Sequence, residues 1–349
     1  EPHSLRQRPG QMTGSYYEAA GVSIERGEKA VDLMRSAVEA THGAQVLGNT
    51  GGFAGLYALA GYAEPVLAST IDGVGTKVMV CRETGTYASL GVDIVNHCAN
   101  DVLATGARPL LFLDYVASGR LDPEAVAGVV RGAALACGEL GIALVGGETA
   151  EMPGLYAEGD LDVVGACVGV CERSELVTGE DTREGDAVLG LASSGLHTNG
   201  YTLARKVVKE AGLSYSDVPD GFDRPLGDVY LEPHRVYSRE VAALRGAVEV
   251  RGMAHVTGGG LPGNLPRSLG GLGARLYASS WEEPGVFSLI RALGNISEDE
   301  MRQVFNLGIG FCVVVPAHEA EKGIETLRGA GCESWRIGEV VERGGVEFV

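Results

Sequence analysis

The sequence predicts an α/β protein of two domains, and three observations point to this class. The chain has 349 residues, enough for about two domains with substantial cores. Apolar segments of strand length alternate with amphipathic segments of helical periodicity. A polar segment without strand pattern, 172–185, interrupts this alternation. We therefore divide the chain into an N-terminal domain, 16–174, with a mixed sheet and helices, and a C-terminal α/β domain, 175–349. Residues 1–15 should form a disordered tail.

The elements of the first half follow from periodicity and capping patterns. Residues 89–99 have the apolar spacing of a helix. Asp122 and Pro123 have the pattern of an N-cap and a first helical position, and the helix that they begin should end at Gly141. The predicted strands are 65–68, 110–114, 142–146 and 162–170.

The second half repeats the alternation. Tyr201 to Ala211 should form a helix, because apolar residues recur along it at helical spacing. The predicted strands are 187–192, 253–256 and 311–315. No short-period repeat or low-complexity tract is present, which argues against a solenoid.

Composition excludes several classes of function. The net charge is −18, from 28 basic and 46 acidic residues, and no basic run could neutralise a nucleic-acid backbone. An anionic small substrate must therefore be held by local donors or by a metal ion. No apolar stretch approaches the roughly 20 residues of a membrane span, so we expect a cytoplasmic protein. The seven cysteines form no Cys-x-x-Cys pair, and we expect no zinc site.

The run from Ser69 to Lys77 is the most informative motif, because an acid, two glycines, a hydroxyl and a lysine follow an apolar strand. The carboxylate of Asp72 suits Mg²⁺, which prefers oxygen ligands. Gly73 and Gly75 allow backbone N–H groups to approach phosphate oxygens, and Thr76 and Lys77 add a hydroxyl and a positive charge. The run therefore suggests a site for a metal-bound polyphosphate.

Two further acidic motifs suit the same metal ions. Asn100 and Asp101, near the end of the helix 89–99, form a hard-oxygen pair, although a helix C-cap with a solvated acid explains them equally well. Glu148 follows a buried strand among glycines, where a carboxylate has no packing use. Glu151 is read more simply as a charged loop residue. Acids at the ends of three elements can converge on one cluster of metal ions.

Two glycine-rich turns suit an anionic substrate. The first joins a strand to a helix, whose N-terminus is a natural anion site. Within it, His197 is either a general acid or base or a capping histidine. The second turn could hold a phosphate together with Arg267, or could be a plain flexible turn. The residues of these two turns are Ser194, Gly195, His197, Thr198 and Asn199, and Thr257, Gly258, Gly259 and Gly260.

Neither a P-loop pattern nor a Rossmann fingerprint is present. Taken together, the motifs resemble those of the phosphoribosylformylglycinamidine cyclo-ligases, or aminoimidazole ribonucleotide synthetases. This family belongs to an ATP-binding superfamily that includes formylglycinamidine ribonucleotide synthase, selenophosphate synthetase and thiamine-monophosphate kinase. The motifs that carry the resemblance are 72–77, 100–101, 112–115, 146–154, 193–201, 257–260 and 305–310.

The resemblance implies a homodimer that pairs through the N-terminal sheets and an ATP-dependent ring closure in de novo purine synthesis. ATP phosphorylates the formamide oxygen of formylglycinamidine ribonucleotide, an amidine nitrogen closes the imidazole ring, and ADP and phosphate leave. By resemblance, Asp72, Asn100, Asp101 and Glu148 coordinate Mg²⁺, and Gly73, Gly75, Thr76 and Lys77 hold ATP phosphates. The residues of the two glycine-rich turns form the substrate side, and Lys77, His197 and Asp101 are the catalytic candidates.

Two positions depart from the family pattern. Gly51 to Gly55 matches the glycine-rich stretch of the family only in part, and His97 stands where a small apolar residue is expected. Two alternatives stay open at this point: a formylglycinamidine ribonucleotide synthase-like enzyme, and a non-catalytic nucleotide-binding regulator.

Overall fold

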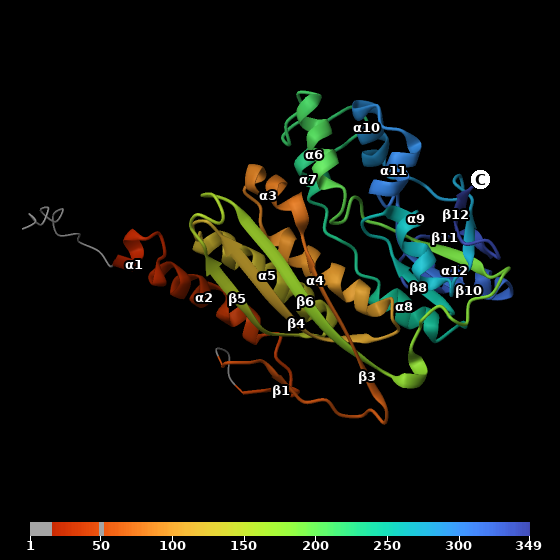
Figure 1. Cartoon of the computed structure of the whole chain (residues 1–349), viewed down its shortest axis with the longest axis horizontal. Coiled ribbons are helices and arrows are strands. Elements are labelled where there is room, and N and C mark those ends of the chain that lie inside the picture. Colours follow the sequence, from red (N-terminus) through yellow and green to blue (C-terminus); the bar gives the residue numbers. More distant parts are fainter. Residues whose placement is uncertain (1–15, 49–51) are drawn as a thin grey trace, which may run out of the picture.

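A computed structural model describes residues 16–48 and 52–349. The predicted tail 1–15 and part of the stretch Gly51–Gly55 lie outside the described residues. Helices and mixed sheets form two layered halves (Figure 1), which confirms the α/β class. The sheets lie on either side of segment 173–186, and we keep the exact domain boundary at residue 174 as a prediction.

The N-terminal sheet has four strands in the order β3-β6-β4-β5. β4 and β5 run parallel because helix α5 (Pro123–Leu140) crosses over between them, whereas β6 is antiparallel to both of its neighbours. The strand bounds are Pro65–Gly73 for β3, Arg108–Ser118 for β4, Ala143–Glu151 for β5 and Leu161–Glu172 for β6.

Helices α4 (Ala88–Leu103) and α5 pack side by side on one face of this sheet, and α2 (Ile24–Glu39) packs against α5 (Figure 1). The caps of α5 confirm the prediction, since Asp122 accepts the backbone N–H groups of the first turn and Gly141 is left-handed with φ 66°. Glycines set the crossing of α4 and α5. A Cβ on Gly91 would lie 1.9 Å from the carbonyl oxygen of Val129, so the two backbones can approach only because the side chain is absent.

The outer face of the N-terminal sheet is apolar and exposed at its β3 edge. Leu67 and Ile71 point out of this face with 61% and 71% of their surface exposed. Exposed apolar side chains that gather on one sheet face are typical of a surface that another protein covers.

The C-terminal sheet has six strands in the order β12-β9-β11-β7-β10-β8. Helices α8 (Ser238–Arg245) and α12 (Ala320–Gly329) pack on one face, and the short α9 (Gly260–Asn264) packs on the other. The strand bounds are Ala187–Ala192 for β7, Gly252–His255 for β8, Gly273–Leu276 for β9, Ile309–Val315 for β10, Ser334–Val341 for β11 and Gly345–Phe348 for β12.

A further group of helices joins the two halves. The helices α6 (Tyr201–Glu210), α7 (Leu226–Tyr230), α10 (Gly285–Gly294) and α11 (Glu298–Val304) share one apolar core with α3 (Val78–Thr84) and α4. The remaining elements are short: α1 (Tyr16–Ala19), β1 (Val46–Leu47), β2 (Leu56–Tyr57) and four single-turn 3₁₀ segments. Among the helices of the described ranges, none combines the length and apolar character needed to cross a bilayer.

Several elements run further than predicted, and in three of them the extension includes site residues. β3 stays paired with β6 through Gly73, so Asp72 lies in a strand. β5 continues to Glu151, so Glu148 also lies in a strand. α4 continues to Leu103 and includes Asn100. In each case tertiary pairing overrides the local Asp-Gly, Gly-Gly or Asn-Asp turn signal.

Candidate active site

A cleft of about 430 Å³ lies between the two halves, where β3, α4 and β8 come together. Asp72 reaches it from β3 and Asp101 from α4. Thr257 and Arg267, from the second glycine-rich turn and the segment that follows it, line the opposite wall. The structure therefore brings together two of the predicted metal ligands and part of the predicted substrate turn.

Both carboxylates keep oxygen lone pairs for a cation. Asp72 Oδ1 accepts the N–H of Gly73 at 2.6 Å, and its Oδ2 lies 2.9 Å from His97 Nε2. Asp101 Oδ1 lies 2.9 Å from His255 Nδ1, and its Oδ2 accepts the Thr70 hydroxyl at 3.1 Å. Each oxygen of a carboxylate has two acceptor positions and uses one here, so two remain on each side chain.

The surroundings keep both acids ionised. Burial raises the pKa of Asp72, but the close contact with His97, its positive charge and the N–H of Gly73 together outweigh burial, so the pKa lies below its ordinary value. For Asp101, burial likewise raises the pKa, and the hydrogen bond and charge of His255 outweigh it, so the net shift is again downward. Ionised oxygen ligands are what Mg²⁺ requires.

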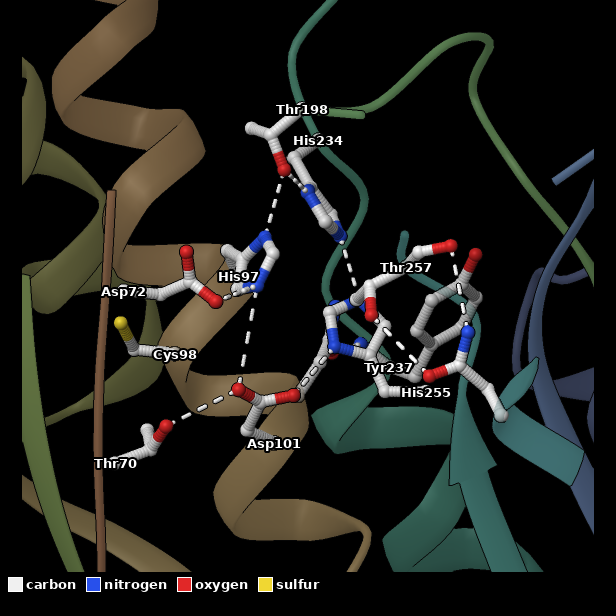
Figure 2. A network of polar contacts seen from close by, with 12 residues as sticks. Thr70, Asp72, His97, Cys98, Asp101, Thr198, His234, Tyr237, His255 and Thr257 are labelled. Carbon is white, nitrogen blue, oxygen red and sulfur yellow. Dashed lines mark hydrogen bonds and ion pairs between the residues drawn. The ribbon is translucent and has the colours of Figure 1, made fainter. Parts of the chain in front are cut away.

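Behind the two carboxylates lies a group of buried histidines (Figure 2), of which the sequence analysis singled out only His97, as a departure from the family pattern. His97 Nδ1 lies 2.7 Å from Thr198 Oγ1, which in turn lies 3.4 Å from His234 Nδ1. The Nε2 atoms of His234 and His255 are 3.0 Å apart. A continuous chain of contacts therefore runs from Asp72 through His97, Thr198, His234 and His255 to Asp101 (Figure 2).

This chain of contacts contains one hydrogen fewer than it needs when all of its imidazoles are neutral. It has five contacts, and each needs one hydrogen between its two heavy atoms. Three neutral imidazoles and one hydroxyl supply one hydrogen each, which fills four contacts. Whichever way the tautomers are arranged, one of the five contacts is left with a lone pair on each side and no hydrogen between them. An added cation inside the group, a proton or a metal ion, removes that conflict.

Lys77 does not face the cleft, which corrects the expectation that it holds an ATP phosphate. Its side chain is fully buried, and Nζ lies 2.8 Å from Asp93 Oδ2. The ammonium group also donates to the carbonyl oxygens of His197 and Glu232, at 3.1 and 3.0 Å. The lysine therefore ties three segments together, and all of its donors have partners.

Asn100 is likewise structural, which corrects its assignment as a metal ligand. Its Nδ2 donates to the carbonyl of Arg235 at 2.8 Å, and its Oδ1 accepts the N–H of Tyr237 at 3.0 Å. Because the side chain is completely buried, no oxygen faces the cleft. Sequence alone could not distinguish this orientation, since the partners lie 135 residues or more away.

His197 is buried beneath the first glycine-rich turn, and only 1% of its surface is exposed. It adopts a left-handed backbone conformation with φ 59°, its Nε2 accepts the N–H of Ser194 at 3.2 Å, and its ring stacks on His234 with centroids 3.9 Å apart. Burial, then the positive charges of His255 and Lys77, hold the pKa of His197 well below its ordinary value. A neutral, stacked histidine in this position supports the turn; it does not cap α6, whose N-cap is Gly200, and its catalytic role stays a prediction.

Glu148 does not join Asp72 and Asp101 within one chain, which corrects the expected convergence of three acids. It lies on β5, at the opposite edge of the sheet from β3, and three strand spacings correspond to about 14 Å. Glu148 lines a separate cavity of about 760 Å³ with Gly147 and Asp114. Burial raises the pKa of Asp114 to about 7. Glu151 is structural, because it pairs with Arg26 at 2.8 Å.

The N-terminus of α6 forms a third cavity, of about 530 Å³. Here the two predicted phosphate groups come together, since Gly75 and Thr76 face Thr198 and Asn199. Thr76 Oγ1 lies 2.9 Å from the hydroxyl of Thr202. Lys206 also lines this cavity and supplies the positive charge that the sequence had assigned to Lys77.

The remaining turn residues have local roles. The hydroxyl of Ser194 donates to the carbonyl of Pro233 at 2.6 Å, and the carbonyl of Gly195 accepts the amide of Asn306 at 2.8 Å. Asn264 donates its amide to the carbonyls of Thr257, Gly258 and Gly260. Gly259 and Gly260 have positive φ, and a Cβ on Gly260 would lie 2.0 Å from the Arg302 carbonyl. The second turn is therefore a fixed structure and not a flexible one.

Comparison with known proteins agrees with this architecture. Residues 54–171 match the family described as AIR synthase related protein, N-terminal domain, and residues 183–349 match AIR synthase related protein, C-terminal domain. A phosphoribosylformylglycinamidine cyclo-ligase of Gloeobacter violaceus is 49% identical over 334 residues, which cover 95% of this chain and 99% of the relative. Those of Sorangium cellulosum and Geobacillus kaustophilus are 49% and 46% identical, over 95% of this chain and 97% of each relative.

Solved structures of lower identity share the fold. A thiamine-monophosphate kinase from Stenotrophomonas maltophilia superposes with a TM-score of 0.69 at 19% identity, covering 92% of this chain and 95% of the other. The hydrogenase maturation protein HypE in complex with ATP gives a TM-score of 0.66 at 18% identity, with 90% and 86% covered. The near full-length matches at almost one residue in two decide the family: this chain belongs to the phosphoribosylformylglycinamidine cyclo-ligases.

Proposed function

We propose that this chain is the ATP-dependent ligase that closes formylglycinamidine ribonucleotide to aminoimidazole ribonucleotide in de novo purine synthesis, with release of ADP and phosphate. The observation that carries the proposal is the pair Asp72 and Asp101, which enter one cleft from different elements and keep free oxygen lone pairs. Phosphoryl transfer needs positioning and charge neutralisation more than a covalent nucleophile, and an acid pair suits that need.

Mg²⁺ fits the residues that are present. Asp72 and Asp101 offer carboxylate oxygens, and the chain of imidazoles behind them fixes their orientation. When bound, Mg²⁺ would neutralise the charge of the ATP phosphates. Asn100 and Glu148 are not proposed as ligands of the same ion, for the reasons of geometry given above.

The chain's own residues would hold the anionic groups of the substrates. Arg267 and Thr257, the first residue of the second glycine-rich turn, line the same cleft as the two acids. Thr76, Asn199 and Lys206 offer a second phosphate position at the N-terminus of α6, where backbone N–H groups and the helix dipole favour an anion. The reaction needs two such positions, one for the phosphates of ATP and one for the ribose phosphate.

The chemistry follows from the bonds that change. The formamide oxygen attacks the terminal phosphorus of ATP, and ADP leaves. The amidine nitrogen then attacks the activated carbon, the carbon–oxygen bond breaks, and the oxygen leaves with phosphate. An amide oxygen is a poor leaving group until it is phosphorylated, which is why ring closure consumes ATP. We propose that Asp101, held by His255 and Thr70, would hold the Mg²⁺ ion, which would supply the positive charge for the reacting phosphoryl group.

We also propose a cytoplasmic homodimer. The exposed apolar residues Leu67 and Ile71 on the outer face of the N-terminal sheet suit a second copy of the chain. An obligate interface through these strands predicts that Ile71→Lys gives a monomer in sedimentation velocity, while Leu155→Lys, at an exposed position outside this face, leaves the dimer intact. A wild-type chain that sediments as a monomer contradicts the proposal.

The activity test supplies the protein with Mg²⁺, ATP and formylglycinamidine ribonucleotide, and measures ADP and the aminoimidazole product. We expect both products in equal amounts, and a loss of about 100-fold or more in kcat for Asp72→Asn and Asp101→Asn. Asp299→Asn is the matched control, because the Asp299 side chain is 91% exposed on α11. ADP without the ring product would indicate another enzyme of the superfamily, such as the synthase. Binding of ATP without turnover would indicate a regulator.

A further inference from the structure

Three histidines from distant parts of the chain meet at one buried point (Figure 2). His97 comes from α4, His234 from the irregular segment between α7 and α8, and His255 from the end of β8. Each offers a ring nitrogen, and these nitrogens all lie within 4.8 Å of one another. The three side chains are buried, with at most 5% of their surface exposed. Burying three imidazoles is less favourable than burying apolar side chains of similar size, because polar groups lose their hydration. The presence of three histidines here therefore calls for an explanation other than core packing.

The hydrogen-bond pattern of the group points to a bound cation. As counted above, neutral groups leave one of its contacts without a hydrogen. The contact between His97 Nε2 and Asp72 is 2.9 Å long but is not aligned as a hydrogen bond, so this nitrogen is buried without a well-formed partner. A metal ion provides the positive charge and uses the imidazole lone pairs directly.

The remaining ring nitrogens are already held as metal-binding histidines usually are. The Nδ1 atom of His255 lies 2.9 Å from Asp101, which forms the carboxylate–histidine pair seen behind many metal ions. His234 Nδ1 contacts the hydroxyl of Thr198. Whichever nitrogen of His97 turns to a metal ion, the other keeps a contact, with Thr198 or with Asp72. The second shell of a site is therefore in place.

The spacing of two of the three ring nitrogens suits a tetrahedral ion. Zinc–nitrogen bonds of about 2.0–2.1 Å at tetrahedral angles place two ligand nitrogens about 3.3 Å apart. The Nε2 atoms of His234 and His255 are 3.0 Å apart, so they need to separate by only a few tenths of an ångström. Three histidines match the number of protein ligands in open zinc sites.

We propose that His97, His234 and His255 bind one first-row transition-metal ion of the Zn²⁺ class, at a site separate from the Mg²⁺ position between Asp72 and Asp101. Neutral imidazoles select such ions, whereas Mg²⁺ prefers oxygen ligands. The expectation of no zinc site rested on cysteine spacing alone, which carries no information on three histidines separated by up to 158 residues. The proposal does not depend on the reaction proposed above.

The test uses the full-length protein, freed of metal with a chelator and dialysed. Co²⁺ serves as a spectroscopic probe, because its visible absorption reports tetrahedral nitrogen coordination. We expect one Co²⁺ per chain, displacement by one equivalent of Zn²⁺, and no displacement by excess Mg²⁺. The proposal would be overturned if the wild-type protein did not bind Co²⁺ saturably. It would also be overturned if Mg²⁺ displaced the bound Co²⁺, because that result would place the ion on the carboxylates.

Variants then identify the ligands. Loss of a residue that hydrogen-bonds a metal ligand typically weakens metal binding by roughly 10- to 100-fold, and we expect a change within this range for Asp101→Asn. His234→Ala and His255→Ala remove ligands themselves and should weaken Co²⁺ binding by more than this. His318→Ala is the matched control, because His318 is exposed on a different surface. Circular dichroism shows whether each variant is folded. If His234→Ala unfolds, His234→Asn, which keeps a polar side chain, repeats the test. Unchanged binding in folded His234 variants would overturn the site.

Discussion

Substituting Gly91 by alanine places a methyl group where α4 and α5 cross. The added Cβ would lie 1.9 Å from the carbonyl oxygen of Val129 and 2.4 Å from the backbone nitrogen of Ala133. An ordinary contact with that oxygen requires a separation of about 3.4 Å, so the helices must move apart by about 1.5 Å. Both clashing groups belong to the backbone and cannot rotate away, which places the cost near the upper end of overpacking, about 3 kcal/mol. Alanine returns about 1 kcal/mol through its helix propensity.

The expected net loss for Gly91→Ala is therefore about 2 kcal/mol in the free energy of unfolding. Gly138→Ala on α5 is the matched control, since no atom lies within 4 Å of its added Cβ, and it should be more stable than wild type by about 0.5–1 kcal/mol. Urea unfolding followed by circular dichroism measures both changes. With a slope of about 2 kcal/mol per molar urea, the two midpoints should differ by about 1 M or more. Equal midpoints would refute the close crossing of α4 and α5.

Three further predictions concern buried polar groups. Burial raises the pKa of Asp114 to about 7, so the stability that its protonated form contributes below pH 4 is lost as the pH rises to 7. The gain in unfolding free energy of Asp114→Asn over wild type should therefore be larger at pH 8 than at pH 5 by about 2–3 kcal/mol. A gain that is the same at both pH values would contradict this. Lys77→Met leaves Asp93 buried without its counter-ion and should cost about 3–5 kcal/mol in urea unfolding, with partial recovery on adding Asp93→Asn. Asn100→Ala should cost about 2–3 kcal/mol, while the Mg²⁺ concentration for half-maximal activity stays as in wild type; a large rise would return Asn100 to the metal site.

Local patterns in the sequence predicted the elements well where one residue determines its own neighbourhood. Asp122 and Pro123 begin α5 and Gly141 ends it, because capping depends on contacts within a few residues. The strand ends were less predictable. Asp72 and Gly73 look like a turn, yet the long neighbour β6 keeps them paired, and no local signal reports the length of a partner strand.

The sequence predicted which acids face the cleft, but it did not predict the residues that surround them. Asp72 and Asp101 face the cleft as the motifs suggested. Lys77 and Asn100 carry equally suitable side chains, but both turn inward to partners more than 100 residues away. His97 was noticed as a departure from the family pattern, and its meaning emerges only beside His234, which the sequence places 137 positions later.

One face of α4 holds both the domain contact and the site. Asp93, His97 and Asn100 recur at intervals of three and four residues, so they point the same way, toward the irregular segment 232–237. Asp93 accepts the N–H of His234 at 2.8 Å, and Asn96 donates to its carbonyl at 2.7 Å. A segment without regular structure must satisfy its backbone groups elsewhere, and here the side chains of α4 do so. The position of His234 therefore depends on the same contacts that join the two halves of the molecule. The same contacts hold His234 beside His97 of α4, whereas His255 reaches the group from β8 of the C-terminal half.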